Sequence, residues 1–360
     1  MADYTTIDDP SAHFQALVFT GTGGDAGASQ PTTHTNTGNS DLQPDFIWFK
    51  DKGATYQHYL VDSSRGRAKG LHSDDSSAET TTGSTSYDLV SFDSDGFKVG
   101  LPSEGNSTNG GTTSKVAWQW KANGGTTASN TDGTITSTVQ ANTTAGFSIV
   151  TWTGTGSAGT IGHGLGVAPK VVIVKARTGV ATSWAVFHKD GSTSDDDTLV
   201  LQTTAAKATY AGFWNNQYPS SSVFGISNDI WLNGNTENFV AYCFAEKQGY
   251  SKFGTYTGAG SSSPFVYTGF KPAFLLIRRI DAANSWGIVD NKRGYNGGTE
   301  TLFADLTNAE SSTYTLDLLS NGFRPASNHS IFNQSSGSYI YMAFAESPFV
   351  TSTGIPTTAR

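Results

Sequence analysis

The chain has 360 residues, a formal net charge of −8 and only 14 % charged residues, together with 41 glycines and 12 % aromatic residues. The aromatic content excludes an intrinsically disordered chain, which would be poor in rings. The scarcity of charge argues against a helical protein, which needs Glu, Lys and Arg in bulk. No cluster of Lys and Arg forms the basic stripe on which duplex nucleic-acid binding depends.

The single cysteine, Cys243, lies between Tyr242 and Phe244 in an apolar run. One thiol makes neither a disulfide within the chain nor a cysteine-based zinc site, and a free Cys in such a run is expected to be buried. The first residues lack a basic region followed by an apolar stretch, so no signal peptide is expected. No apolar run reaches the length of a membrane span. We therefore expect synthesis in a cytoplasm.

An aromatic-Thr-Gly signature marks three similar stretches of the chain, at Phe19–Gly23, Trp152–Gly156 and Tyr256–Gly260. The recurrence of one signature at a similar spacing indicates a repeat architecture. Each signature closes a predicted strand. The large residues that open these strands are Phe14, Phe147 and Tyr250.

A proline followed by an apolar run comes next in each repeat, at Pro44–Lys50, Pro169–Lys175 and Pro272–Arg278. Proline cannot donate to a strand ladder, so it is expected at the strand entry. The continuous apolar run predicts a strand that is buried on both faces. The basic residue that closes each run is expected to return the chain to water.

Further strands recur downstream in the same order. A half-buried strand that begins with a ring is predicted from its alternating pattern, at His58–Asp62, Trp184–His188 and Trp286–Asp290. A tight turn predicts a hairpin in Ser91–Phe97 and in Leu319–Phe323, and the match is weakest in Val223–Ile226. The closing, largely buried strands are Val116–Lys121, Val240–Glu246 and Ile340–Glu346.

These landmarks predict an all-β protein of three tandem, divergent β-sandwich units with Gly/Ser/Thr-rich loops. A polar tract is expected to link the first two units and to set unit 1 apart, although the alternation in Thr134–Val139 also fits an edge strand. The expected boundaries are an N-terminal arm at 1–13, unit 1 at 14–122, the polar linker at 123–144, unit 2 at 145–247, unit 3 at 248–346 and a C-terminal tail at 347–360.

Sequence motifs predict no catalytic residue, no metal site and no cofactor. The chain has no nucleophile elbow, and His163 lies in a glycine-rich turn. Asp93–Gly96 reads as a hairpin turn and Asp195–Asp197 as a solvated loop, neither of them a calcium loop. A glycosidase needs two carboxylates across a cleft, and the sequence cannot pair its loop carboxylates Glu79, Glu104, Asp190 and Glu237.

Two loops of unit 2 combine aromatic rings with amide side chains, a mixture that suits a carbohydrate face. Unit 2 is also where the repeat is most altered, and function concentrates on loops above a rigid scaffold. The alternative is that these rings cover the core from a loop. The candidate glycan-binding residues are Trp214, Asn216, Tyr218, Trp231 and Asn233.

The sequence resembles virion structural proteins of tailed bacteriophages, especially marine ones, which would place the protein in the virion. The resemblance covers nearly the whole chain. It is carried by the Thr-Gly-Thr-Gly signature, His163–Gly166, Pro169 with its Val-Ile-Val-Lys strand, Trp184–His188, Tyr242–Glu246, Asp8–Gln15 and Gly38–Asp45.

This resemblance implies a non-enzymatic structural protein of the virion. A tail fibre or adhesin for host attachment is the first expectation. A decoration protein of the capsid or tail that binds only other virion proteins is the second, and a glycan-degrading enzyme is the least favoured. The implied partners are other virion proteins, further copies of this chain (a trimer, as such appendages are commonly built) and a host-surface glycan.

Overall fold

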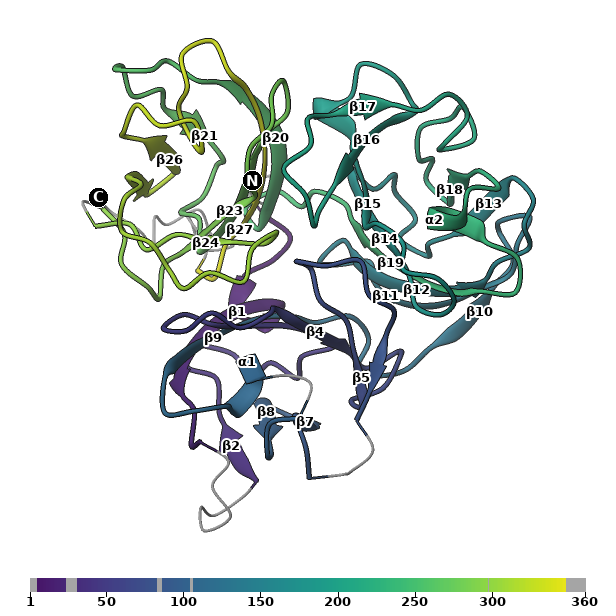
Figure 1. Ribbon diagram of the computed structural model, residues 1–360, viewed down its shortest axis with the longest axis horizontal. Helices are drawn as coiled ribbons and strands as arrows, with labels where there is room; N and C mark the ends of the chain where they lie inside the picture. The colour runs from purple at the N-terminus through teal and green to yellow at the C-terminus, as the bar shows by residue number, and fades with distance from the viewer. Residues whose placement is uncertain (1–4, 24–30, 83–85, 104–105, 297, 348–360) are drawn as a thin grey trace.

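The computed structural model describes residues 5–23, 31–82, 86–103, 106–296 and 298–347. The protein is all-β, and three lobes surround a common centre (Figure 1). Unit 1 runs from purple to blue, unit 2 is teal, and unit 3 runs from green to yellow. Each lobe pairs a large antiparallel sheet with a smaller one, which confirms the prediction of an all-β sandwich fold.

The large sheet of unit 1 has the strand order β1-β9-β3-β4, and its small sheet has the order β2-β8-β7. The large-sheet strands are β1 (Phe14–Thr20), β9 (Ser114–Trp120), β3 (Phe46–Asp51) and β4 (Tyr59–Asp62). The other elements are η1 (Pro10–Ala12), β2 (Thr32–His34), β5 (Lys69–Gly70), β6 (Thr80–Thr81), β7 (Leu89–Asp93), β8 (Gly96–Val99) and α1 (Asn106–Asn109).

Unit 2 has the largest sheet, in the order β10-β11-β12-β19-β14-β15-β16-β17. These strands are β10 (Ala128–Asn130), β11 (Ser137–Asn142), β12 (Phe147–Thr153), β19 (Asn238–Phe244), β14 (Val171–Ala176), β15 (Ala185–His188), β16 (Asp197–Val200) and β17 (Ala208–Thr209). The small sheet joins β13 (Gly159–Gly162) to β18 (Val223–Ile226), and the helices are η2 (Lys189–Gly191) and α2 (Ile230–Asn233).

Unit 3 repeats the order as β20-β27-β22-β23-β24, with a small sheet β21-β26-β25. The large-sheet strands are β20 (Ser251–Thr257), β27 (Ser338–Phe344), β22 (Phe274–Arg279), β23 (Gly287–Asp290) and β24 (Leu302–Phe303). The small-sheet strands are β21 (Val266–Tyr267), β25 (Leu316–Leu319) and β26 (Gly322–Pro325). None of the helices in the described residues is long and apolar enough to cross a membrane.

Strand register shows that the three units are equivalent. The first residue of the proline strand lies opposite the end of the closing strand in every unit: Phe46 opposite Trp120, Val171 opposite Phe244, and Phe274 opposite Phe344. The opening strands follow the same rule with Phe14, Phe147 and Ser251. The opening position of unit 3 is therefore Ser251, and the expected Tyr250 precedes the strand by one residue.

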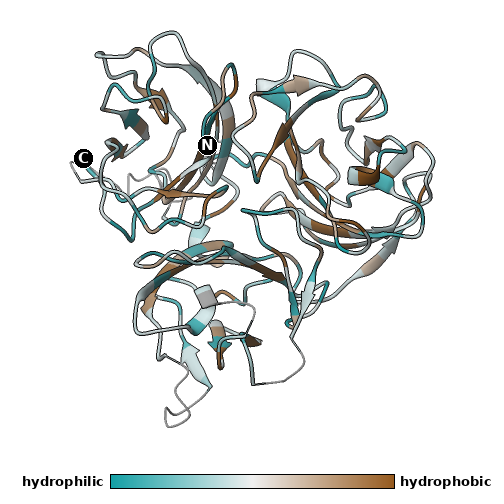
Figure 2. Ribbon diagram, viewed as in Figure 1, coloured by the Kyte–Doolittle hydropathy of each residue, from teal (hydrophilic) through white to brown (hydrophobic). Residues whose placement is uncertain are grey.

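Each large sheet is buried on both faces. Its outer face packs on the small sheet of the same unit, as Ile47 and Phe49 of β3 pack with Phe97 of β8. Its inner face joins one central cluster to which all three units contribute. Figure 2 shows apolar colouring along these sheets. Unit 1 is therefore not set apart, because its inner face is as deeply buried in the centre as those of the other two units.

Equivalent rings meet at the centre of the molecule. Trp120, Phe244 and Phe344, here called the central trio, end the three closing strands. Their ring centroids lie 5.6 Å apart for Trp120 and Phe344, 5.7 Å for Phe244 and Phe344, and 6.4 Å for Trp120 and Phe244. The mutual contact of three equivalent residues places the pseudo-threefold axis of the chain between them.

The segments expected to be a linker and an arm pack against the units. The segment 123–144 contains β10 and β11, and β11 pairs with β12 along Thr138–Asn142. In the arm, Ile7 is buried in the central cluster and the Thr5 hydroxyl donates to the Gln248 carbonyl at 2.8 Å. The polar tract therefore extends the sheet of unit 2, as its alternating pattern allowed. The tail from residue 348 lies outside the described residues.

The basic residues that close the proline strands are buried, which corrects the expectation that they return to water. Lys50, Lys175 and Arg278 are each 0 % exposed. Each donates to a backbone carbonyl of a loop in a neighbouring unit. Desolvation lowers the pKa of both lysines to about 8 and that of Arg278 to about 10. The acceptors are the carbonyls of Thr307, Ser76 and Ala205, respectively.

A buried ion pair links unit 1 to unit 2. The Arg65 Nε donates to Asp62 Oδ2 at 2.5 Å, and both side chains are fully buried. The Tyr242 hydroxyl of unit 2 donates to the same carboxylate oxygen at 2.8 Å. Arg65 also bonds Glu79 at 2.9 Å, so the guanidinium and carboxylate charges are paired within the interface.

The same device links unit 3 to unit 1, while the third junction differs. The Arg293 Nε donates to Asp290 Oδ2 at 2.6 Å, and the Trp118 Nε1 of unit 1 donates to that oxygen at 2.9 Å. Between units 2 and 3, the position of these two aspartates is occupied by His188, whose Nε2 lies 3.3 Å from the Tyr341 carbonyl. Burial lowers the pKa of His188 to about 4. Two of the three junctions are thus charged, and the third holds a neutral imidazole.

Candidate functional site

The structure separates the five predicted glycan residues into buried and accessible positions. Trp214 is 2 % exposed, and its Nε1 donates to the Thr198 hydroxyl at 2.7 Å. Its ring packs on Phe187 and Phe213 in the core of unit 2. Trp214 is therefore unable to stack on a surface ligand, and the alternative that this ring covers the core is correct.

Asn233 is also buried, and its amide holds the Thr-Gly loop of its own unit. Its Oδ1 accepts the Thr155 N–H at 3.0 Å, and its Nδ2 donates to the Ser157 carbonyl at 2.6 Å. Asn109 makes the corresponding bond to the Thr22 N–H at 2.9 Å, and Asn333 makes it to the Ala259 N–H at 2.7 Å. Asn233 is a structural residue of the repeat, which corrects its prediction as a ligand residue.

Trp231 joins a surface cluster of rings. It opens toward solvent on α2, and its ring lies 6.0 Å from Phe213 and 6.5 Å from Tyr210 between centroids. Tyr210 is 46 % exposed and Ile230 is 53 % exposed. We call Tyr210, Phe213, Ile230 and Trp231 the aromatic ledge. The sequence-based prediction missed Tyr210 and Ile230, because isolated exposed apolar residues carry no motif.

A buried carboxylate and an exposed one fix the two segments that carry the ledge. Asp196 is 4 % exposed, and its carboxylate accepts the N–H of Gly212 at 2.6 Å and that of Trp214 at 2.9 Å. On the other segment, the Asp229 carboxylate caps α2 by accepting the Trp231 N–H at 2.8 Å. The rings of the ledge are therefore held on ordered backbone, so a ligand would not have to order these loops when it binds.

The remaining two predicted residues are exposed. Asn216 and its neighbour Asn215 both have a left-handed backbone conformation, with φ of 50° and 58°, respectively. Tyr218 is 38 % exposed, and the Lys189 ammonium lies 3.0 Å from its ring centroid. That cation occupies one face of the Tyr218 ring. Of the predicted set, Trp231 is the residue that the structure places within the aromatic ledge.

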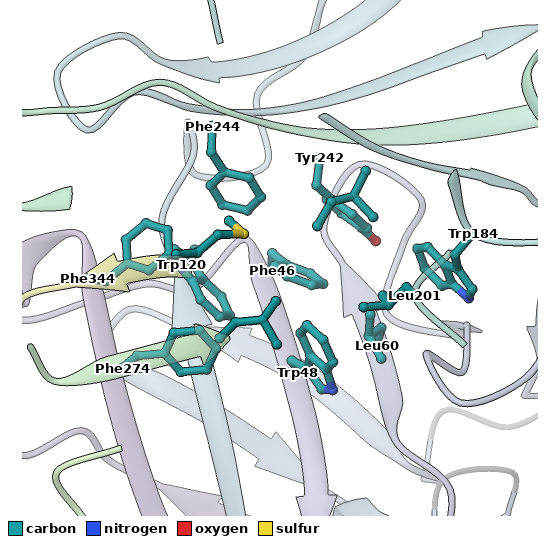
Figure 3. Close-up of a pocket in the computed structure, with 13 residues that line it drawn as sticks. Phe46, Trp48, Leu60, Trp120, Trp184, Leu201, Tyr242, Phe244, Phe274 and Phe344 are labelled. Carbon is teal, nitrogen blue, oxygen red and sulfur yellow. The ribbon is translucent and has the colours of Figure 1, made fainter. Parts of the chain in front are cut away.

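The enclosed apolar cavity at the centre of the molecule is not a binding site. Figure 3 shows rings from all three units around it. Its volume of about 20 Å³ is close to that of a single water-sized probe. The lining includes Phe46 and Trp48 of unit 1, Tyr242 of unit 2 and Leu276 of unit 3. The cavity is a small packing gap between three converging sheets.

The carboxylates weighed for acid–base catalysis do not converge on a cleft. Glu79 is bound by Arg65 and Arg177, which lowers its pKa against the effect of burial. Asp190 pairs with Lys170 at 2.8 Å, and Glu237 accepts from the Thr178 hydroxyl at 2.7 Å. Each is thus engaged in a different part of the fold. Glu104 lies outside the described residues.

Other polar groups singled out in the sequence are structural. The His163 Nδ1 accepts the Leu165 N–H at 3.2 Å, which stabilises its own turn. Cys243 is fully buried, and burial raises the pKa of its thiol. Within the described ranges, no group of three or more His, Cys, Asp or Glu side chains could hold a metal ion.

Three β-sandwich units around one core define the class of fold. The second unit carries a rigid aromatic surface. The chain belongs to the family described as domain of unknown function DUF7483, whose model matches residues 9–348. Comparison with curated proteins gives no match, and neither does comparison with solved structures. Because the match spans all three units, the family is defined by the whole three-lobed body and not by a single repeat.

Proposed function

We propose that this protein is a non-enzymatic structural protein of a bacteriophage virion, a tail fibre or adhesin that contacts a host-surface glycan through the aromatic ledge. The observation that carries the host-contact proposal is the exposure of Tyr210 and Ile230 beside the half-buried Trp231 on one rigid surface. The virion assignment is supported by the resemblance of the Thr-Gly-Thr-Gly, proline-strand and closing-strand motifs to phage structural proteins.

The ledge has the physical properties of a recognition surface. Exposed apolar residues that gather on one surface mark interaction sites more often than scattered ones do. Tyr and Trp give a large contact area with little conformational entropy to lose. The exposed amide of Asn216 lies on the same loop as Tyr210 and Phe213, and it supplies a donor and an acceptor for hydroxyl groups.

A glycan array, followed by titration with host envelope polysaccharide, tests the ledge. Trp231→Ala and Tyr210→Ala are expected to lower affinity by at least about tenfold each, since stacked rings act as anchors. Phe265→Ala is the matched control, because Phe265 is a ring 50 % exposed on unit 3. Failure of the wild-type protein to bind any host envelope material contradicts the adhesin proposal, as does equal loss of binding in the control.

The second candidate is a decoration protein of the capsid or tail whose surfaces bind only other virion proteins. The pseudo-threefold arrangement of the central trio favours it, since such a body matches a lattice site of threefold symmetry. A particle reconstruction separates the two candidates. High copy number on a symmetric lattice supports decoration, and a position at the tip of a tail appendage supports the adhesin.

A further inference from the structure

The sheet of unit 3 ends where the sheet of unit 2 continues. In unit 2, β12 is flanked on its outer side by β11 and then β10. In unit 3, the equivalent strand β20 is the last strand of its sheet. Unit 2 receives its extra strands from the segment 123–144, whereas only Ala245–Tyr250 lies between β19 and β20. The chain therefore supplies no equivalent strand from the N-terminal side of unit 3.

The segment in unit 2 shows what fits beside such a sheet edge. Thr138–Asn142 pairs antiparallel with Thr151–Phe147 of β12, and Ile135 bridges to Ile161 of β13. The segment thereby closes the space between the large and the small sheet. Its Val139 is 7 % exposed and packs in the core of unit 2.

Glycines of unit 2 make room for that segment. A Cβ placed on Gly162 would lie 1.7 Å from Asn130 Oδ1, and one on Gly164 would lie 2.8 Å from Val139 Cγ1. Strand register makes Tyr267 the equivalent of Gly162, since Gly162 pairs with Val223 of β18 and Tyr267 with Gly322 of β26. Unit 3 thus has the ring of Tyr267, which is 59 % exposed, at the position where unit 2 has a glycine.

A groove occupies the corresponding place in unit 3. It lies between the start of β20 and the end of β21, and its volume is about 420 Å³. Its lining includes Ser251 and Lys252 of β20, Tyr267 of β21, Gly269 and Glu246. Ser251 and Lys252 belong to β20 itself, so a peptide backbone in the groove would lie beside that strand.

The outer edge of β20 presents backbone groups to this groove. The Ser251 N–H donates to the Lys247 carbonyl at 2.9 Å and the Phe253 N–H donates to Glu246 Oε1 at 2.7 Å, both away from β27. Because hydrogen-bonding directions alternate along a strand, the N–H groups of Thr255 and Thr257 point the same way. An exposed edge of this kind is a template for another strand.

We propose that the groove between β20 and β21 binds an extended segment of a partner polypeptide, which adds a strand to β20 as β11 does to β12. The occupant is an uncharged, mainly polar strand with an apolar residue that faces the core, as Val139 does in Ser137–Asn142 of unit 2. A carbonyl of that strand replaces Glu246 on the Phe253 N–H. Glu246 then keeps its ion pairs with Lys170 at 3.0 Å and Lys252 at 3.4 Å. This inference does not rest on the proposed glycan contact.

A labelled peptide with the sequence of residues 134–142 is the probe, titrated against the full chain with fluorescence anisotropy as the readout. Saturable binding is expected, with slowed amide exchange at Thr255. Thr255→Pro removes an outward N–H and is expected to weaken binding by about tenfold or more. Thr257→Pro is the matched control, since it lies on the same edge beyond the length that β11 covers in unit 2. The melting temperature of both variants reports whether the fold is retained.

Several outcomes overturn the proposal. They are absence of binding by the wild-type chain, equal binding of a scrambled peptide, and equal weakening by the two proline variants. Dimerisation of the chain that Thr255→Pro abolishes would assign the groove to a second copy instead. Peptide binding that requires removal of residues 348–360 would assign it to the chain's own end.

Discussion

Removal of the Asp62 carboxylate is expected to cost more stability than any surface substitution in this protein. Asp62→Ala leaves the guanidinium of Arg65 fully buried without its nearest counter-ion, which lies 2.5 Å away in the wild type. It also strips the Tyr242 hydroxyl of its acceptor across the junction of units 1 and 2. Breaking a buried pair from one side costs about 3–5 kcal/mol. Denaturant titration followed by tryptophan fluorescence measures this free energy of unfolding.

Three further variants identify the source of that loss. Tyr242→Phe removes only the hydroxyl that bonds the carboxylate, so a loss of about 1.5–3 kcal/mol is expected. The double variant Asp62→Leu with Arg65→Met removes both charges and should recover most of the stability. Asp317→Ala breaks the exposed pair with Arg324, whose side chain is 48 % exposed, and should cost at most about 1 kcal/mol. A cost for Asp62→Ala no greater than that for Asp317→Ala refutes the reasoning.

Three other predictions concern the common core and the buried ionisable groups. Phe344→Ala truncates one ring of the central trio and is expected to cost about 3–5 kcal/mol in a denaturant titration, with a single transition for all three units; separate transitions would contradict it. Stability should rise from pH 8 to about 10.5, because the pKa of Lys50 and Lys175 is lowered to about 8 in the folded state. In that range the unfolded chain binds the lysine protons and the folded chain does not, so a higher pH favours folding. Melting curves of Lys50→Met should show a shallower rise. Stability should fall as the pH drops from about 6.5 toward 4, since His188 is held neutral by burial with a pKa of about 4; His188→Gln should lessen that loss, and an unchanged acid profile would contradict the assignment.

The sequence predicted the strands well because each is encoded locally. The runs Pro44–Lys50, Pro169–Lys175 and Pro272–Arg278 all became β-strands with the same register. The shared centre could not be predicted in this way. An apolar alternation is the same whether that face meets the partner sheet of one sandwich or the sheet of a neighbouring unit.

The candidate site was predicted less well, and the reasons lie in particular residues. Asn233 looked like a loop amide because its neighbours Trp231 and Leu232 differ from their equivalents in the other units. The signal that it is structural was present, since an Asn recurs at the same place before each closing strand, at Asn109 and Asn333. Trp214 is followed by the polar run Asn215–Gln217, and only the tertiary structure shows that its loop folds back over the core.

The buried bases explain why the units behave as one body. A proline strand whose apolar run ends in Lys or Arg would fit an isolated sandwich if the charge reached water. Here the charge is 0 % exposed in all three units, and in each it donates to a carbonyl of a neighbouring unit. A separated unit would therefore expose an apolar sheet face and lose the acceptor that the neighbouring unit supplies to its basic residue. The repeat is a unit of sequence, whereas the stable unit of structure is the closed ring of three.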